Sequence, residues 1–311
     1  MTAPADDRLG FAPDEDVPLP YMARTRAYYL AIGYETPYRW AHYTSAPFQP
    51  LTKPLDRCRV TIITTAAPYD PAKGDQGPGA PYNGAAKFYS VYAGDTSRTH
   101  DLRISHIAYD RVHSSAEDSG SWFPLPQLIR LTGEGRIGEV APRFFGAPTN
   151  RSHRVTLETD APDILARCRA DHVDAAVLVP NCPVCHQTVS LVARHLEAGG
   201  IATVVMGCAK DIVEHAAVPR FLFSDFPRGN AAGKPHDVAS QASTLELALR
   251  VLEGAPGPQT SVQSPLRWSE DPSWKRDYSN PALLSADELA RRRAEFEAQK
   301  AVAKNRHVNA T

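Results

Sequence analysis

The sequence predicts an α/β protein in which a three-layer, mostly parallel, Rossmann-like sheet carries extended N- and C-terminal arms. Three short apolar segments support this prediction, and helical patterns follow the last two: 59–65, 175–179 and 201–206. Their length and their aliphatic, β-branched residues are typical of strands that are buried on both faces. Repeated strand–loop–helix units favour a parallel sheet between layers of helices. We therefore divide the chain into an N-terminal arm with an aromatic-rich segment (1–53), an α/β domain (54–254) and a C-terminal tail with a charged helix (255–311).

The composition restricts the class of protein. The chain has 311 residues and a formal net charge of −1, so it lacks the basic excess that a nucleic acid or an anionic membrane surface requires. No apolar run approaches the roughly 18–20 residues of a membrane span, and the first residues do not form a basic segment followed by an apolar one. Five cysteines, an odd number, are typical of a reducing compartment. We expect a cytoplasmic protein that binds neither nucleic acid nor membrane.

The N-terminal part of the chain is predicted to contain a helix, a strand and a long loop. Residues 1–17 are acidic and lack periodicity, so we expect a flexible arm, and a short helix follows at 21–33. An aromatic-rich segment (34–48) is expected to lie across the core. The strand at 59–65 leads into a long loop rich in glycine and proline (66–84), which is typical of a functional or a disordered segment. Its glycines do not match a phosphate-binding motif, so we predict a loop that covers the substrate and no nucleotide site.

A second strand is predicted at 102–107, and a polar segment with four titratable residues follows it: Asp110, His113, Glu117 and Asp118. Open α/β sheets bind their ligands where strands end. We therefore predict that His106, near the end of this strand, or His113 acts as a general acid, because a histidine pKa of about 6.5 suits proton transfer at neutral pH. The three acidic residues are candidates for substrate binding. A solvated polar loop is the alternative for the whole segment.

Further helices and strands are expected to complete the domain. The expected helices lie at 126–132, 161–170 (with Cys168 in the core), 207–215 and 238–252, a further strand lies at 220–224, and 143–150 is interpreted as loop or strand. Asp225 begins a loop that is expected to close over the sheet edge, which makes it another candidate for substrate binding. A mostly polar helix at 285–304 is expected to pack along a neighbouring surface or subunit, so we predict a homo-oligomer.

The candidate centre of the molecule is the motif Cys182-Pro-Val-Cys185-His186, which follows the buried strand at 175–179. A helix that starts near Pro183 would place Cys182 at its cap, beside backbone N–H groups that have no partner within the helix. Those groups favour an anion, so we predict that the pKa of Cys182 falls from about 8.5 by one to several units. Cys185 lies on the apolar face of the same helix, which should pack on the sheet. The pattern thus predicts Cys182 as an exposed nucleophile and Cys185 as a shielded resolving thiol.

A third thiol has an equivalent position one unit further along the chain. Cys208 follows the strand at 201–206 just as Cys182 follows its own strand. If the two strands are neighbours, the thiols of Cys182, Cys185 and Cys208 gather at one edge of the sheet. We predict that Cys208 assists the thiol chemistry or acts as a relay in it.

Other interpretations of the motif remain open. Buried cysteines are often inert, in which case the pair would be structural. The Cys-X-X-Cys spacing also suits a metal, so Cys182, Cys185 and one of His106, His113 or His186 could hold zinc or iron, whereas thiol chemistry needs no cofactor. The motif fits the attachment sequence of c-type haem, although no secretory signal precedes it. For the whole chain, a non-catalytic assembly subunit with a long polar tail is a further hypothesis.

Several segments, in this order, resemble one known family: Val60-Thr-Ile-Ile-Thr-Thr-Ala, Ile104-Ser-His, Trp122-Phe-Pro, Gly135-Arg-Ile-Gly, Asn181-Cys-Pro-Val-Cys-His, Val204-Val-Met-Gly-Cys and Pro219-Arg-Phe-Leu-Phe-Ser-Asp-Phe-Pro-Arg-Gly-Asn. The family is the catalytic component of the glycine, sarcosine and betaine reductases and the D-proline reductases, the selenoprotein B family, and the resemblance runs from about Pro54 to Glu253. It implies a reductase that cleaves a C–N bond of a small substrate, with Cys182 or Cys185 in place of the family's selenocysteine. We expect a thiol or a thioredoxin-like protein as the electron donor, because a disulfide formed in the reaction must be reduced.

Overall fold

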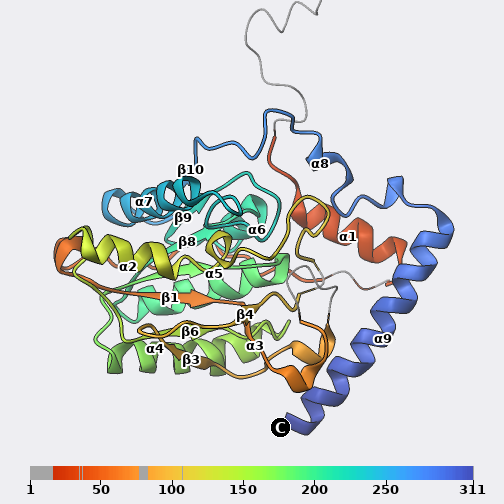
Figure 1. Cartoon of the computed structure of the whole chain (residues 1–311), viewed down its shortest axis with the longest axis horizontal. Helices are drawn as coiled ribbons and strands as arrows, with labels where there is room; N and C mark the ends of the chain where they lie inside the picture. Colours follow the sequence, from red (N-terminus) through yellow and green to blue (C-terminus); the bar gives the residue numbers. More distant parts are fainter. Residues whose placement is uncertain (1–16, 35, 37, 77–82, 107, 311) are drawn as a thin grey trace, which may run out of the picture.

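The computed structural model confirms an α/β fold (Figure 1). It describes residues 17–34, 36, 38–76, 83–106 and 108–310. Most of the predicted flexible arm at 1–17 therefore lies outside the described residues. The same holds for 77–82 in the predicted substrate-covering loop and for residue 107 in the predicted second strand.

A mixed, mostly parallel sheet forms the centre of the molecule. Among the described residues it has eight strands, in the order β10-β9-β8-β7-β1-β6-β3, with β5 paired to β1. Its strand pairs are parallel except for β3 with β6, which is antiparallel. The strands are β1 (Arg59–Thr64), β3 (Tyr92–Asp95), β5 (Glu139–Val140), β6 (Arg143–Gly146), β7 (Ala175–Val179), β8 (Ala202–Gly207), β9 (Arg220–Phe223) and β10 (Thr260–Gln263).

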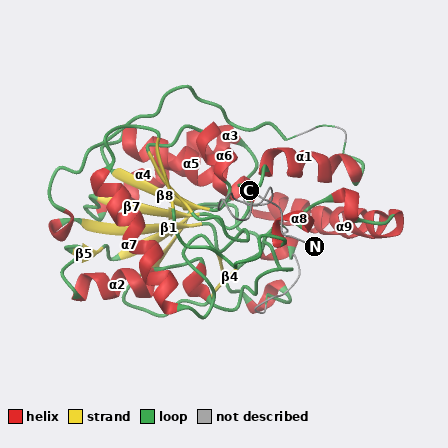
Figure 2. Ribbon diagram, turned by 90° about the horizontal axis from the view of Figure 1, so that it is seen from above, coloured by secondary structure: helices red, strands yellow, loops and turns green. Residues whose placement is uncertain are grey.

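Helices cover both faces of this sheet and give the three layers that the sequence predicts. α2 (Leu125–Gly133) and α7 (Val238–Gly254) pack on one face, and α4 (Ala161–Ala170), α5 (Pro183–Ala198) and α6 (Lys210–His215) pack on the other, with the strands between them (Figure 2). The remaining α-helices are α1 (Tyr21–Ala31), α3 (His153–Val155), α8 (Trp274–Asp277) and α9 (Ala286–Ala310). None of the helices in the described part of the chain is long and apolar enough to cross a membrane.

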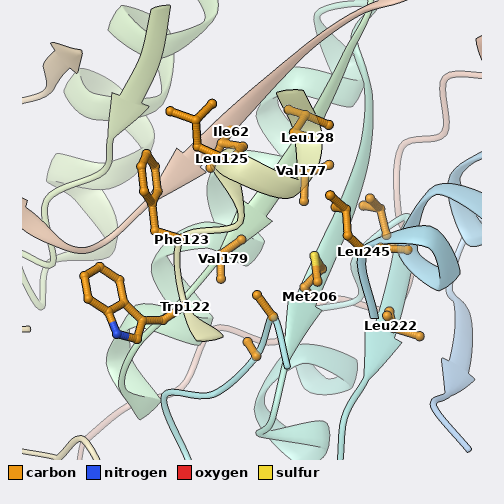
Figure 3. Close-up of a cluster of buried hydrophobic side chains, with 14 of the residues drawn as sticks. Ile62, Trp122, Phe123, Leu125, Leu128, Val177, Val179, Met206, Leu222 and Leu245 are labelled. Atoms are coloured by element: carbon orange, nitrogen blue, oxygen red, sulfur yellow. The ribbon is translucent and has the colours of Figure 1, made fainter. Parts of the chain in front are cut away.

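The central strand β7 shows why these segments form a sheet that is buried on both faces. Every residue of β7 is buried. Val177 and Val179 face α2 and α7, where they join a cluster with Leu128 and Leu245 (Figure 3). Their neighbour Leu178 points to the opposite face and joins the cluster that includes α4 and α5. Because side chains alternate along a strand, a continuous apolar run fills both cores at once.

The path of the chain through the sheet determines where a ligand can bind. After β1 the chain adds β6 on one side, then returns to place β7 on the other side of β1, and β8, β9 and β10 follow outward. Ligands of open α/β sheets bind outside the carboxyl ends of the strands at such a reversal. Here the ends of β1 and β7 are joined directly, because the Thr65 hydroxyl donates to Asn181 Oδ1 (2.7 Å) and accepts from the Asn181 amide (3.1 Å).

The two terminal arms lie together beside the carboxyl ends of the strands, with α1, α8 and α9 side by side in Figure 2. α1 is attached to α6, since the Met22 amide donates to the Asp211 carboxylate (2.8 Å). A small apolar cluster extends this contact and includes Tyr21, Ile212 and Tyr278. The arms therefore pack on the elements that follow β8.

α9 begins close to the predicted position and packs on its own chain. Its Phe296 ring meets the rings of Tyr29 and Tyr34 edge to face, with centroids 5.6 and 5.2 Å apart. The polar helix was predicted to pack along a neighbouring surface or subunit, and this contact confirms the first alternative. The homo-oligomer stays a prediction.

The predicted strand at 102–107 is wrong as part of the main sheet. β4 (Leu102–Arg103) pairs with β2 (Ala67–Pro68) in a separate antiparallel sheet. The guanidinium of Arg111 donates to the carbonyls of Ile104 (3.0 Å) and His106 (2.8 Å), so a side chain occupies the groups that a neighbouring strand would use. The sequence analysis also missed the edge strands β3 and β10, because neither contains an apolar run.

A buried ion pair links α5 to the beginning of β9. Glu197 Oε1 and Arg220 Nη1 lie 2.7 Å apart, and both side chains are almost fully excluded from solvent. The carboxylate also accepts from the amide (2.6 Å) and the hydroxyl (2.9 Å) of Thr203, and Arg220 Nη2 donates to the carbonyl of Gln49 (2.8 Å). Burial raises the pKa of Glu197, against the opposing charge of Arg220.

We expect Glu197→Leu to lower the free energy of unfolding by about 3–5 kcal/mol, because it leaves the Arg220 charge buried without a counter-ion. Adding Arg220→Met should recover much of this loss, since an apolar pair of similar volume replaces the ion pair. Urea unfolding of the wild type and both variants measures the difference. A double variant no more stable than Glu197→Leu would show that the buried arginine charge is not the cause.

Candidate active site

The start of α5 places Cys182 where the sequence predicts it. Pro183 is the first helical residue, and Cys182 is the N-cap, with an extended backbone at φ −145° and ψ 171°. Its sulfur accepts a hydrogen bond from the amide of Cys185 (3.2 Å). The predicted capping geometry is confirmed. The predicted exposure is wrong, because only 5% of Cys182 is accessible to solvent.

Cys185 is fully buried on the face of α5 that packs on the sheet, as predicted. Its sulfur lies 3.3 Å from the hydroxyl of Thr149, which follows β6. Interactions with the side chains of Cys182 and His106 lower the pKa of this thiol. One ring nitrogen of His106 and the sulfurs of Cys182 and Cys185 all lie within 4.8 Å of one another. Two sulfurs and one imidazole thus converge at the carboxyl edge of the sheet.

The negative charge of the thiol pair rests on Cys185. Burial raises the pKa of Cys182 well above its ordinary value, and the hydrogen bond to Cys185 adds to this, so the helical amide beneath the sulfur does not compensate. Burial also disfavours a Cys185 thiolate, but hydrogen bonds from Cys182, His106 and Thr149 and the charge of His106 together hold the pKa of Cys185 well below its ordinary value. The predicted fall in the pKa of Cys182 is therefore wrong. The hydrogen bond from the helical amide does lower the pKa of Cys182, but burial raises it by more.

His106 is the predicted acid that the structure brings to the thiols. It lies in the segment after β4 and is 7% exposed. Its Nδ1 is buried and has no hydrogen-bond partner among the described residues. Its position depends on Arg111, whose guanidinium holds the His106 carbonyl. One ring nitrogen lies within 4.8 Å of both sulfurs, so the ring can hold or release a proton for a bound molecule.

Cys208 and His186 form a structural link beneath this site. The Nε2 atom of His186 accepts from the amides of Cys208 (3.0 Å) and Ala209 (3.3 Å), and its Nδ1 bonds the carbonyl of Cys182 (2.7 Å). Burial lowers the pKa of His186 to about 4 and raises that of Cys208 to about 12. Both nitrogens of His186 are thus occupied, which argues against the haem interpretation and against His186 as a metal ligand. Cys208 lies at the same edge but outside the set of three close ligand atoms.

His113 lies in a different arrangement, between two carboxylates. Its Nδ1 is 3.0 Å from both oxygens of Asp110, and its Nε2 is 3.1 Å from Asp277. Asp110 is only 2% exposed, so a solvated loop is the wrong description at that residue. The role predicted for His113 as an acid stays a prediction. The structure ties its ring to carboxylates and does not place it in the cluster of Cys182 and Cys185.

The other candidate substrate-binding residues are occupied by the protein or lie at the surface. Asp118 accepts from the amides of Gly120 and His236 and from the side chain of Gln241. Asp225 forms an ion pair with Lys275 (2.5 Å). Glu117 is exposed. In the described part of the chain no hydrogen bond or ion pair joins these three acids to the thiol pair, so their role in substrate binding stays a prediction.

Sequence reasoning missed several residues that surround the thiols. Thr149 contacts Cys185, and Lys87 lies within electrostatic range of both sulfurs, with a pKa that burial lowers. Arg228, which follows β9, is fully buried and acts on Cys182 through its charge. A basic residue directly after a buried strand, as in Asp225-Phe-Pro-Arg228, is the one sequence signal that could have indicated it.

Buried polar atoms without a partner concentrate at the same edge. Among the described residues they include His106 Nδ1, Asn181 Nδ2, Ser224 Oγ and both terminal nitrogens of Arg228. Asn181 follows β7, Ser224 and Arg228 follow β9, and His106 lies near the thiols at the end of β7. Unpaired buried polar groups are rare in folded proteins and call for an explanation such as a ligand. The carboxyl edge of the sheet therefore has the character of a polar binding site beside a thiolate.

Comparison with known proteins supports the resemblance stated from the motifs. The chain is 27% identical over 221 residues to D-proline reductase subunit gamma of Acetoanaerobium sticklandii, which covers 70% of this chain and 88% of that protein. It is 24% identical over 218 residues to glycine reductase complex component B subunit gamma of Symbiobacterium thermophilum, covering 66% of this chain and 48% of that protein. The chain is a homologue of these reductase subunits. No family model and no solved structure matches it.

A third homologue is the sarcosine reductase complex component B subunit beta of Peptoclostridium acidaminophilum, 23% identical over 173 residues, which cover 55% of this chain and 39% of that protein. The chain thus spans most of the D-proline reductase subunit but about half or less of the glycine and sarcosine reductase subunits that it matches. The likeness to the first protein extends over nearly its whole length.

We expect a single fast-reacting thiol between about pH 6 and 8, because the pKa of Cys185 lies well below the usual thiol value of about 8.5 while Cys182 and Cys208 stay protonated. The rate of alkylation by iodoacetamide should change little in this range. Thr149→Val and His106→Asn remove groups that favour the thiolate, so the rate should then rise with pH as for an ordinary thiol. Cys168→Ser, in the core of α4, is the control. A fast phase that survives Cys185→Ser would assign the thiolate to another residue.

Proposed function

We propose that this chain is the thiol-bearing component of a reductase that cleaves a C–N bond in a small substrate. The observation that carries the proposal is the geometry of the thiol pair, because the buried sulfurs of Cys182 and Cys185 and one ring nitrogen of His106 lie within 4.8 Å of one another. The surroundings also lower the pKa of Cys185. A low-pKa thiolate next to a second cysteine is the arrangement that nucleophilic attack and disulfide formation require. The names of the homologues, subunits of proline, glycine and sarcosine reductases, agree with this chemistry.

In the first step the Cys185 thiolate attacks the carbon that carries nitrogen. A C–S bond forms, and the C–N bond breaks with its electron pair going to nitrogen. The His106 ring, in its protonated form, donates the proton that completes the amine, as a general acid does. This assignment exchanges the roles predicted from the sequence, and the opposite pKa shifts support it, lowered at Cys185 and raised at Cys182.

In the second step Cys182 resolves the adduct. Its sulfur attacks the sulfur of Cys185, so that an S–S bond forms and the C–S bond breaks. The electron pair goes to carbon, which takes the proton that Cys182 gives up, passed through His106. The two cysteines are oxidised to a disulfide, and the C–N bond is reduced to C–H and N–H.

An external dithiol closes the cycle. A small thiol or a thioredoxin-like protein reduces the Cys182–Cys185 disulfide and becomes oxidised itself. Because the homologues are named as subunits of reductases, we further propose that the chain works with other protein subunits. A cytoplasmic location and a homo-oligomer are proposed with it.

The second candidate is a metal centre of zinc or iron. The specific observation is the approach of one nitrogen and two sulfurs to within 4.8 Å, since the sulfurs of a tetrahedral zinc site lie about 3.8 Å apart. His106, Cys182 and Cys185 would hold the ion, which would supply Lewis-acid chemistry. If Nε2 held the ion, the unpartnered Nδ1 of His106 would be unfavourable, because ligating histidines almost always donate their second N–H to a partner. Elemental analysis after dialysis separates the candidates, since one equivalent of bound metal would replace the thiol mechanism.

Mild oxidation should convert the wild-type chain to a form lighter by two hydrogen atoms, and the single peptide that contains both Cys182 and Cys185 should carry the loss as an internal disulfide, because their sulfurs are within 4.8 Å. Thioredoxin should reverse the change. Incubation of Cys182→Ser with D-proline, sarcosine or glycine should leave a covalent adduct on Cys185, because the resolving thiol is missing, while the control Cys168→Ser behaves as the wild type. Intact-mass and peptide mass spectrometry follow both. Disulfide exchange that involves Cys208 in place of Cys182 would contradict the proposal.

A further inference from the structure

Arg228 is a fully buried cation with no counter-ion among the residues that the structure describes. It lies in the loop after β9, and its exposed fraction is 0%. Its Nε donates to the carbonyl of Ala108 (2.7 Å), but Nη1 and Nη2 have no hydrogen-bond partner among the described residues. A buried guanidinium with four unused N–H bonds is costly, so such groups are normally paired.

Two tyrosine rings hold this guanidinium in place. Its central carbon lies 4.7 Å from the ring centre of Tyr21 and 4.0 Å from that of Tyr278. The hydroxyl of Tyr278 donates to the carbonyl of Ala108, the group that also accepts from Arg228 (3.3 and 2.7 Å). Cation–π contacts restrict the side chain but do not satisfy its N–H groups. The rings fix the cation and leave its terminal nitrogens free to bind.

The nearby carboxylates are already engaged with other groups. Asp110 faces His113, Asp225 faces Lys275, and Asp211 accepts from the backbone amides of Met22 and Ile212. None of the three forms an ion pair with Arg228 in the described part of the chain, although Asp110 and Asp211 interact with its charge at longer range. The charge of Arg228 also acts on Cys182 and Cys208. The cation therefore belongs to the edge of the sheet that carries the thiols.

A second buried arginine shows how the same chain pairs such a charge. Arg220, at the beginning of β9, is as deeply buried as Arg228. Its Nη1 lies 2.7 Å from Glu197, and its Nη2 donates to Gln49. The terminal nitrogens of Arg220 thus have protein partners, while those of Arg228 have none among the described residues. The difference points to a ligand that supplies the partner from outside.

We propose that Arg228 binds the carboxylate of the substrate and that Tyr21 and Tyr278 are positioning residues for it. The two rings pack against the guanidinium and leave its edge free. A carboxylate can form two parallel hydrogen bonds with that edge. This inference rests on the proposed thiol chemistry and assigns the residue that would recognise the carboxylate shared by D-proline, sarcosine and glycine.

The proposal gives the terminal arms a role in the site. Tyr21 opens α1, and Tyr278 follows α8, so both lie outside the stretch from about Pro54 to Glu253 that carries the sequence resemblance. The two residues contact each other, with ring centres 5.6 Å apart. The arms thus complete a binding site whose reactive groups come from the α/β domain.

A pair of alkylating reagents tests the proposal without knowledge of the natural substrate. Iodoacetate carries a carboxylate, and iodoacetamide is its neutral counterpart. With the wild type, we expect alkylation of Cys185 by iodoacetate to saturate with concentration, and acetate to protect against it. In Arg228→Met the saturation should disappear, and the ratio of the iodoacetate rate to the iodoacetamide rate should fall by ~10-fold or more, the loss of a charge-assisted bond pair.

Controls separate a binding role from a structural one. Arg194→Met removes another arginine stacked on a tyrosine, at 3.8 Å from the Tyr43 ring, and should leave the ratio unchanged. Tyr278→Leu should lower the ratio, and Tyr278→Phe should restore most of it, because the ring returns. Arg228→Met should melt no lower than the wild type, since it removes an unpaired buried charge.

The outcomes distinguish this inference from the proposed function. An equal ratio in the wild type and Arg228→Met, with Cys185 still reactive toward iodoacetamide, would overturn the carboxylate site and leave the thiol mechanism intact. A proportional loss of both rates in Arg228→Met would make Arg228 a counter-ion of the thiols and would also overturn the site. A wild-type Cys185 that reacts with neither reagent would overturn the proposed function itself. Protection by phosphate but not by acetate would replace the carboxylate with a phosphate-bearing ligand.

Discussion

A negative charge held inside the protein is the constraint on which the rest of the site depends. A thiolate moved from water into an apolar interior is strongly disfavoured unless donors and opposite charges surround it. At Cys185 these come from three elements that are distant in the sequence, namely Cys182 at the start of α5, Thr149 after β6 and His106 after β4. The reversal of the chain between β1 and β7 brings the strand ends together, and the hydrogen bonds between Thr65 and Asn181 join them. The thiolate at Cys185 is therefore stabilised only when the chain has this fold.

The central strands could be predicted from the sequence because burial on both faces leaves a direct mark on composition. β1, β7, β8 and β9 are short aliphatic or aromatic runs, and each was predicted within one or two residues. β3 and β10 carry no such mark, since an edge strand needs one apolar face at most and its pairing depends on a distant partner. The segment after residue 101 shows the limit of local reasoning, because Arg111 binds its carbonyls and prevents their pairing in the sheet.

At the site, the position of each cysteine could be predicted from the sequence, but the direction of the pKa shift of Cys182 could not. The cap at Cys182 follows from Pro183 and the preceding strand, and both are visible in the sequence. The location of the charge depends on desolvation and on His106, which lies 79 residues before Cys185 in the chain. No local pattern reports such a contact. Arg228 escaped prediction for the same reason, because its unpaired state becomes visible only when every neighbour has been assigned.

The two charges at this edge are coupled, and the coupling bears on reactivity. Arg228 favours a thiolate at Cys182, although burial outweighs it there. An anion bound to Arg228 would neutralise this cation and add a negative charge near the sulfurs, so both thiol pKa values would rise when the site fills. Thiolates of higher pKa are intrinsically better nucleophiles, provided that they remain ionised. The groups that favour a Cys185 thiolate are Cys182, His106 and Thr149, and Arg228 acts through its charge on Cys182. His106 and Thr149 would still favour the thiolate with an anion at Arg228. A carboxylate at Arg228 would therefore leave the thiolate charged while making it more reactive, whereas a thiol that Arg228 alone kept ionised would become protonated when the same anion bound.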